Sequence, residues 1–276
     1  MCDWGSLEME AHGRGATRVY NRPTMQVEEA PRTMPLRPAA LATLPGRDPA
    51  LPDLYAFMTE AELRFESLRM RIVDRRMAAG GEETETTEVW LRHPGFAKVV
   101  QSRGGALERD FDLWLSDGES VQTYDARSGV ATRRRVPPVP VGAADERLPA
   151  HARLYLPVTA LPAETLAETF VHPHGFCRNV LVTGTTRRIG TAVLLGGREA
   201  LVLRCDHPRT SHVLTDRPDH WLEVAVDYQT GIVLLLAEHI GGRITRHGEV
   251  TALRFDEPIG DEAFRLHLSS DTRTLY

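Results

Sequence analysis

A short run of the chain, residues 232–237, is apolar at every position, and it constrains the fold more than any other stretch. A membrane-spanning helix needs about 20 apolar residues, so this run is far too short to be one. Turn-forming glycines flank it, Gly231 before it and Gly241 and Gly242 after it. The run is therefore predicted to be a strand, and a strand without polar positions must be covered on both faces.

Residues 219–268 around this run predict an antiparallel meander. Its first strand, residues 221–227, alternates apolar positions with polar ones such as Glu223 and Asp227, as a half-buried strand does. Short turns then favour up-and-down topology. The second face of the central strand covers either a packed core or a ligand cavity, and sequence periodicity leaves both interpretations open.

The overall composition indicates one large core and no nucleic-acid partner. The chain has 276 residues, of which 42% are hydrophobic. A net charge of −5 gives no basic stripe for nucleic acid. Residues 1–50 contain frequent prolines without apolar periodicity, so we predict a disordered or loosely attached segment there. The folded domain is predicted over residues 51–268, and a C-terminal tail over residues 269–276.

The N-terminus predicts no export signal. Residues 1–15 include acidic side chains and lack the apolar core of a signal peptide, which predicts a cytoplasmic protein as written. No run is long enough to predict a transmembrane segment. The cysteines Cys2, Cys177 and Cys205 leave two interpretations, reduced buried thiols or one bridge between Cys177 and Cys205.

The first half of the domain predicts one helix followed by hairpins. Apolar residues recur every three or four positions over residues 53–72, which predicts an amphipathic helix of roughly four turns. The pattern becomes extended over residues 70–76, so the helix is predicted to continue into a first strand before Gly80 and Gly81. Residues 86–101 and 110–136 then alternate around turns at Gly95 and Gly118, as hairpins do.

The second half predicts a loop, a short helix and further strands. Residues 137–157 are rich in proline and alanine, and residues 161–170 have the pattern of a short helix that ends at His172. Strands follow over residues 180–195 and 199–207, with a short one at 212–215 before the meander. Together these elements predict an α+β fold: a strongly curved antiparallel sheet of about 10–11 strands, forming a half-open, unclosed β-barrel with helices covering its concave side.

Candidate chemistry is sparse. His172, His174 and Cys177 lie close in sequence and Cys205 and His207 form a second pair, but their spacing does not match a known structural zinc half-site. The sequence lacks a nucleophile elbow, a phosphate-binding loop and a dinucleotide-binding motif. We therefore predict no enzymatic activity, no metal and no cofactor.

Two hairpin sequences, EVWLRHPGFAKVV (residues 88–100) and LWLSDGESVQTYD (residues 113–125), resemble hairpins of the bacterial LolA-like lipoprotein carriers. The stretch EVTALRFDEPIGDEAFRLHL (residues 249–268) is similar to that family's closing strand and FxL ending. The resemblance covers residues 53–268. It extends to the related RseB-like domains, which regulate envelope-stress sigma factors, and to divergent actinobacterial relatives of both groups.

The resemblance implies an unclosed antiparallel barrel with helices as its lid, whose hydrophobic interior binds acyl chains of lipoproteins or other lipids. Members of the family are usually exported, whereas this N-terminus predicts a cytoplasmic protein. Arg92 is the nearest candidate for the arginine with which the family contacts lipid.

We expect a non-catalytic, monomeric carrier or sensor that binds an apolar ligand, such as a lipid or acyl chain, in the lumen. One alternative is an RseB-like regulatory domain that binds a protein partner, and another is a metal-dependent enzyme that uses the Cys/His cluster. Each predicted cavity residue could equally belong to an ordinary core. The predicted ligand-binding residues are Phe57, Phe65, Trp90, Arg92, Phe96, Trp114, Tyr124, Trp221 and Leu234.

Overall fold

The computed structural model describes residues 38–104, 111–135, 157–209, 217–266 and 273–275, all within the unit Pro35–Tyr276. The segment predicted as loose over residues 1–50 is described only from residue 38. The predicted strand at 212–215, and all but the last residue of the predicted loop at 137–157, lie outside the described residues.

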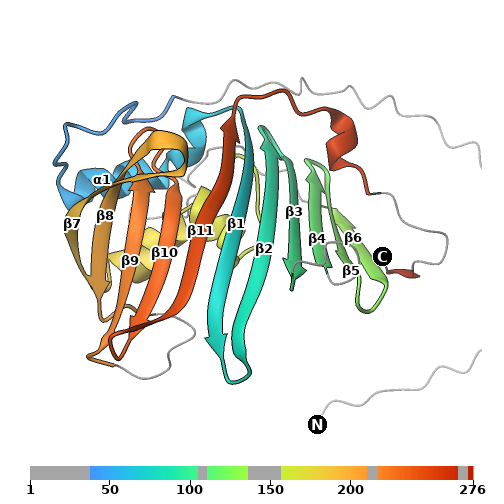
Figure 1. Ribbon diagram of the computed structural model, residues 1–276. Coiled ribbons are helices and arrows are strands. Elements are labelled where there is room, and N and C mark those ends of the chain that lie inside the picture. Colours follow the sequence, from blue (N-terminus) through green and yellow to red (C-terminus); the bar gives the residue numbers. More distant parts are fainter. Residues whose placement is uncertain (1–37, 105–110, 136–156, 210–216, 267–272, 276) are drawn as a thin grey trace, which may run out of the picture. The chain divides into compact units, whose positions relative to one another are not determined.

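Within this part of the chain, the strands form one continuous sheet that is coloured from cyan to red in Figure 1. Its order is β12-β6-β5-β4-β3-β2-β1-β11-β10-β9-β8-β7. All neighbours are antiparallel except β12, which pairs in parallel with β6. The strands are β1 (Ser67–Ala78), β2 (Gly81–Arg92), β3 (Phe96–Arg103), β4 (Phe111–Asp117), β5 (Ser120–Asp125), β6 (Val130–Arg135), β7 (Thr185–Leu194), β8 (Arg198–Asp206), β9 (His220–Asp227), β10 (Val233–Ile240), β11 (Arg243–Phe255) and β12 (Arg273–Leu275).

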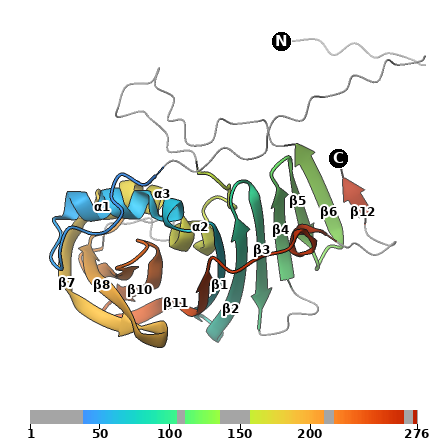
Figure 2. The same ribbon diagram turned by 90° about the horizontal axis from the view of Figure 1, so that it is seen from above.

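The predicted fold class is confirmed. The two ends of the sheet, β12 and β7, are not bonded to each other, so the sheet does not close into a barrel. Seen from above, the β7–β11 end of the sheet curls around the helices, while β1–β6 continue as a more open wall (Figure 2). This arrangement is the half-open antiparallel barrel expected from the sequence.

The predicted hairpin turns are present because their residues supply the required backbone conformations. Gly95 and Gly118 both adopt positive φ, which glycine tolerates without steric cost. Asp117 starts the β4–β5 turn, where its Oδ1 accepts hydrogen bonds from the backbone N–H groups of Glu119 and Ser120 at 3.0 and 2.7 Å. These local contacts fix the registers of β2–β3 and β4–β5.

The pairing of β1 with β11 joins the two halves of the sheet. Leu68 lies opposite Phe255 and Arg76 lies opposite Arg246, with an irregularity in register after Arg71. Asp256 reinforces the junction, because its Oδ1 accepts a hydrogen bond from the backbone N–H of Glu66 at 2.6 Å.

The predicted helix over residues 53–72 is too long. The structure has a helix α1 (Leu51–Thr59) and a 3-10 turn η1 (Ala61–Arg64), and the chain is already extended at Phe65. Leu68 and Ile72 belong instead to β1. Positions that are four residues apart share a face in a helix and also in a strand, so this spacing fits both structures.

The region after residue 160 is more helical than predicted. Helix α2 (Leu166–Val171) begins later than expected and ends at His172 as expected. The short α3 (His174–Phe176) and a turn of π-helix, η3 (Cys177–Leu181), follow. The strand predicted from residue 180 begins only at Thr185, so that prediction is wrong at its start. Two further 3-10 turns are η4 (Leu195–Gly197) and η5 (Asp261–Phe264).

The helices α1, α2 and α3 lie inside the curve of the sheet (Figure 2). We call the face that they cover the inner face. Phe57 of α1 and Phe170 of α2 are buried in the same core as Leu203 of β8 and Val224 of β9. The described helices therefore cover the β7–β2 part of the sheet and do not extend over β4–β6.

The apolar run at 232–237 is covered on both faces, as predicted, with Leu235 only partly buried. Asp227, which was predicted on a polar face, is fully buried instead. Its carboxylate accepts hydrogen bonds from Nε and Nη2 of Arg198, both at 2.8 Å. A further hydrogen bond from the backbone N–H of Thr230 closes the β9–β10 turn.

Candidate functional site

A cavity of about 640 Å³ lies between the inner face of the sheet and the helical segment from residue 163 to 180. One side of it is apolar. Leu222 of β9 and Leu236 of β10 line it from the sheet, and Leu166, Phe176 and Val180 line it from the helices. This volume is within the range of small-molecule binding sites in proteins.

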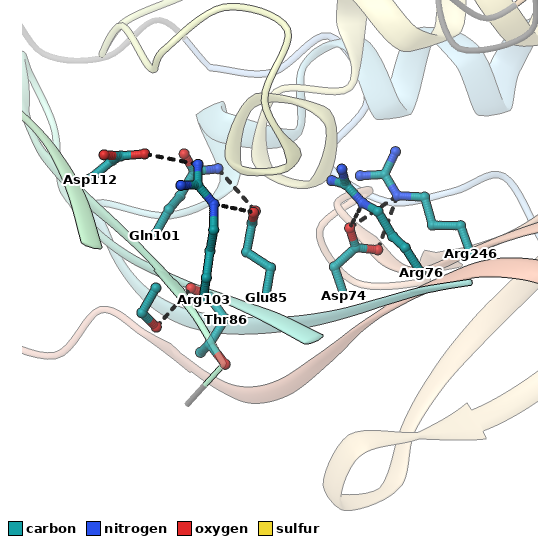
Figure 3. A network of polar contacts seen from close by, with 9 residues as sticks. Asp74, Arg76, Glu85, Thr86, Gln101, Arg103, Asp112 and Arg246 are labelled. Carbon is teal, nitrogen blue, oxygen red and sulfur yellow. Dashed lines mark hydrogen bonds and ion pairs between the residues drawn. The ribbon is translucent and has the colours of Figure 1, made fainter. Parts of the chain in front are cut away.

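Another part of the cavity wall is polar and centres on a buried carboxylate. Asp74 of β1 is only 1% exposed. It accepts a hydrogen bond from Nε of Arg76 at 2.7 Å and from Nε of Arg246 on β11 at 3.0 Å (Figure 3). Both arginines line the cavity. A buried carboxylate requires such pairing, because an unpaired buried charge is strongly destabilising.

A second polar cluster continues along the inner face onto β2, β3 and β4. Glu85 accepts a hydrogen bond from Nε2 of Gln101 at 3.4 Å and lies 4.0 Å from Nε of Arg103 (Figure 3). Arg103 also donates to Asp112 at 3.2 Å. Because Glu85 and Gln101 line the cavity, its floor changes from apolar at Leu222 and Leu236 to charged and polar at Glu238 of β10, at β11 and at β1–β3.

Local caps position the helical side of the cavity. Thr165 precedes α2, and its Oγ1 accepts a hydrogen bond from the backbone N–H of Glu168 at 3.3 Å. The Glu168 carboxylate in turn accepts from the backbone N–H of Glu164 at 2.6 Å. Such reciprocal contacts satisfy the unpaired N–H groups at the start of a helix.

The end of α2 is anchored by the buried carboxylate of Glu62. Its two oxygens accept hydrogen bonds from the backbone N–H of Val158 at 3.0 and 3.1 Å. Nε2 of His172, which lines the cavity, lies 3.1 Å from the same carboxylate. These contacts hold α2 over the cavity against the turn that precedes β1.

A smaller cavity of about 320 Å³ lies along the inner face of β3–β6. Trp114 and Tyr124 line it, together with Val99, Thr132 and Pro162. Two of the nine predicted ligand-binding residues, Trp114 and Tyr124, are thus beside a cavity.

Three of the other predicted residues lie in the packed core. Phe57, Phe65 and Leu234 are buried, and none of them lines either cavity. Phe57 packs under the guanidinium of Arg64, with 3.7 Å from Cζ to the ring centroid. Phe65 stacks on His93. Contact with a ligand stays a prediction for these residues.

The remaining four predicted residues alternate away from the inner face. Arg92 donates to the carbonyl of Ile259 at 2.7 Å and lies over the ring of Phe96. Trp90 lies beside the Lys98 ammonium, and Trp221 stacks on His239 with 3.6 Å between ring centroids. Neither cavity is lined by these four, and their role in ligand binding stays a prediction.

Sequence reasoning missed Asp74, Arg76 and Arg246, which form the polar side of the larger cavity. One signal was available: Leu68, Met70 and Ile72 alternate along β1, and Asp74 occupies the next position on the same buried face. A carboxylate that continues an apolar face indicates a buried ion pair.

The Cys/His cluster does not form a metal site among the described residues. Cys177 and Cys205 are free, buried thiols. Burial raises the pKa of Cys177 to about 12 and also raises the pKa of Cys205. Both therefore remain protonated at neutral pH, a state that disfavours nucleophilic chemistry and metal ligation. Within the described ranges, no helix is both long and apolar enough to cross a membrane.

The unclosed half-barrel with helices on its inner face is similar to several solved structures, including the following three. No family model and no curated protein matches the chain. In a complex of Pseudomonas aeruginosa MucA and MucB, the match has 16% identity and a TM-score of 0.42, and covers 78% of this chain and 60% of that one. An uncharacterized conserved protein from Thermus thermophilus matches with 9% identity and a TM-score of 0.44, covering 82% and 99%.

The third similar structure is a LolA superfamily protein from Nitrosomonas europaea, with 10% identity and a TM-score of 0.31, covering 78% of this chain and 97% of that one. The neighbours thus include a member of the superfamily that the sequence resembles, and MucB, a homologue of RseB. This chain spans about 62% of the length of the MucB structure.

Proposed function

We propose that this protein is a non-catalytic binding protein that holds an amphipathic ligand, such as a lipid or another molecule with an acyl chain, in the larger cavity. One observation carries the proposal: the cavity of about 640 Å³ has an apolar side at Leu222 and Leu236 and a charged side at Arg76 and Arg246. A ligand with an apolar part and a polar part fits such a division, because each part then meets groups of its own kind.

The partners of the cavity's ionisable groups favour binding over catalysis. Glu85 is engaged by Gln101, Glu238 by His220 at 2.9 Å, and His172 by Glu62. General acid–base catalysis needs a group that faces the substrate with an accessible proton or lone pair. These pairings are typical of structural contacts that shape a cavity.

A pair of matched substitutions tests the proposal. Val180 lines the cavity, whereas Val182, two residues further on, is 59% exposed. We expect Val180→Trp to fill the cavity and weaken binding of a fluorescent fatty acid by roughly tenfold or more, since a packed indole and a ligand cannot share the space. Val182→Trp adds the same indole at an exposed position and should leave binding unchanged.

Fluorescence titration and native mass spectrometry of the purified protein provide the measurements. Loss of binding in the Val180 variant alone supports the cavity as the site. If the unmodified protein binds no fatty acid and carries no lipid in the mass spectrum, the proposal is wrong. Equal binding by both variants would place the ligand outside this cavity.

A further inference from the structure

Two arginines on neighbouring strands present their side chains to the same part of the cavity. Arg76 of β1 and Arg246 of β11 lie directly opposite each other in the register of the sheet. Both side chains lie on the inner face and line the cavity. Adjacent arginines repel each other unless an anion lies between them, and Asp74 supplies that anion.

The contacts with Asp74 hold each guanidinium by one nitrogen only. Nε of Arg76 and Nε of Arg246 donate to the carboxylate, as Figure 3 shows. Within the described part of the chain, no hydrogen bond or ion pair engages the Nη atoms of either arginine. The Nη atoms of both guanidinium groups therefore remain available as donors beside the cavity. The two positive charges share one negative carboxylate, so the cluster carries a net positive charge.

Three of the acidic groups that line the cavity differ from these arginines, because their carboxylates have partners. Glu85 accepts from Gln101, Glu168 accepts from the backbone N–H of Glu164, and Glu238 lies 2.9 Å from Nε2 of His220. The hydrogen-bonding capacity left over on the polar side thus consists mainly of arginine donors. Such donors favour an anionic group over a cationic one.

We propose that Arg76 and Arg246 bind the anionic group, a phosphate or a carboxylate, of the ligand that occupies the cavity. This inference rests on the proposed function and specifies the ligand as an anionic amphiphile. Guanidinium groups suit this role, because their planar forks match the oxygens of phosphate and carboxylate groups. The apolar side begins close by, since Glu238, the β10 neighbour of Arg246, is only two residues from Leu236.

Three probes separate the anionic group from the apolar chain: dodecyl phosphate, dodecanol and inorganic phosphate. We expect the unmodified protein to bind dodecyl phosphate roughly tenfold or more tightly than dodecanol, given the strength of charge-assisted hydrogen bonds. Inorganic phosphate should compete weakly, because it lacks the chain that contacts Leu222 and Leu236.

Arg76→Gln and Arg75→Gln form a matched pair of variants. Arg76 is 44% exposed, so its loss leaves Asp74 paired with Arg246 and should preserve the fold. Arg75 is 40% exposed, lies on the opposite face of the same strand and pairs with Glu249. We expect Arg76→Gln to bring the affinity for dodecyl phosphate close to that for dodecanol, and Arg75→Gln to keep the difference.

Isothermal titration calorimetry distinguishes the outcomes. Equal affinity of the unmodified protein for dodecyl phosphate and dodecanol overturns the anion site while leaving the proposed function intact. Binding of neither amphiphile overturns both. An equal loss of selectivity in both variants overturns the assignment of the anion site to these arginines. If inorganic phosphate binds as tightly as dodecyl phosphate, the inference that the ligand is an amphiphile is wrong.

Discussion

The buried carboxylates Asp74, Glu62 and Asp227 each have at least one partner that lies far away in the sequence or across a turn. Asp74 and Arg246 are separated by 172 residues, and Glu62 and the backbone N–H of Val158 by 96. A buried carboxylate that loses all of its partners keeps an uncompensated charge, at a cost of about 3–5 kcal/mol. Both contacts therefore stabilise the fold. The contact of Asp74 with Arg246 also shapes the wall of the cavity, and the contacts of Glu62 hold α2 over it.

His93 is a residue for which the structure predicts a pH dependence. Its ring stacks on Phe65, and its Nδ1 lies 2.7 Å from Oγ1 of Thr159. Burial lowers the pKa of His93 to about 4, below the ordinary value of 6.5. Between these two values the unfolded chain binds more protons than the folded one, so stability is lost as the pH falls through this window.

We expect the free energy of unfolding to decrease between pH 7 and pH 4 by on the order of 3 kcal/mol from His93 alone. Urea unfolding of the unmodified protein and of His93→Gln at several pH values measures this contribution. The variant should show a shallower pH dependence. An NMR titration of the His93 ring with a midpoint near 6.5 would contradict the prediction.

The polar side of the cavity shows why sequence alone could not predict the site. The candidates chosen from the sequence were mostly aromatic, and aromatic residues fill cores as readily as they contact ligands. Arg76 and Arg246 are two of many arginines in the chain, and only their position opposite each other on β1 and β11 distinguishes them. Register between distant strands is not encoded in local periodicity.

At the scale of elements, the turn between β9 and β10 joins the sheet to helix α1. Gly231 in this turn has φ of 83°, and a Cβ at this position would lie 2.9 Å from Cδ1 and 3.0 Å from the carbonyl oxygen of Phe57. Arg64 also donates to the carbonyl oxygens of Thr230 and Phe57 at 3.0 and 2.7 Å. The glycine is thus required both for its backbone conformation and for close packing.

Two alanine substitutions separate these requirements. Gly242→Ala, in the β10–β11 turn, introduces a Cβ at positive φ with no atom within 4 Å, and should cost about 1–2 kcal/mol of strain. Gly231→Ala adds the clash with Phe57 and should cost about 1–3 kcal/mol more. Equal losses in chemical denaturation would show that α1 can move aside without cost.

Elements were predictable where local signals determine them. The hairpins of β2–β3, β4–β5 and β10–β11 follow from glycine turns and period-two patterns, and the sequence located all three. The predicted helix over 53–72 was too long, because its last part belongs to β1, a strand with neighbours on both sides, β2 and β11. Hydrogen bonding to two partners overrides a local pattern that fits a helix as well.

At the scale of the whole molecule, the sheet is covered on its other face as well. The chain after β11 returns over β3 and β4, where Phe264 of η5 is 3% exposed and packs against Phe96. Phe264→Ala should lower the free energy of unfolding by about 3–5 kcal/mol, as for other buried aromatics. Ligand binding in the cavity should be unchanged, because Phe264 does not line it.

Thermal denaturation and fatty-acid titration of the Phe264 variant together measure both effects. A stable variant that binds less ligand would contradict this separation between the two faces. The sequence predicted the curved, unclosed sheet from the number of hairpins, but not this outer cover. A segment that lies on a sheet without joining it has no periodicity to mark it.

The pairing of β1 with β11 also determines the order in which the protein can fold. Hairpins such as β2–β3 close short loops and can form early. The pairing of β1 with β11 must bring together residues as far apart as Asp74 and Arg246. The entropic cost of closing this long loop is offset only when the contacts between the two strands form, late in folding. We therefore expect the edge of β1 to stay uncovered during synthesis until β11 emerges, and an uncovered strand edge favours aggregation.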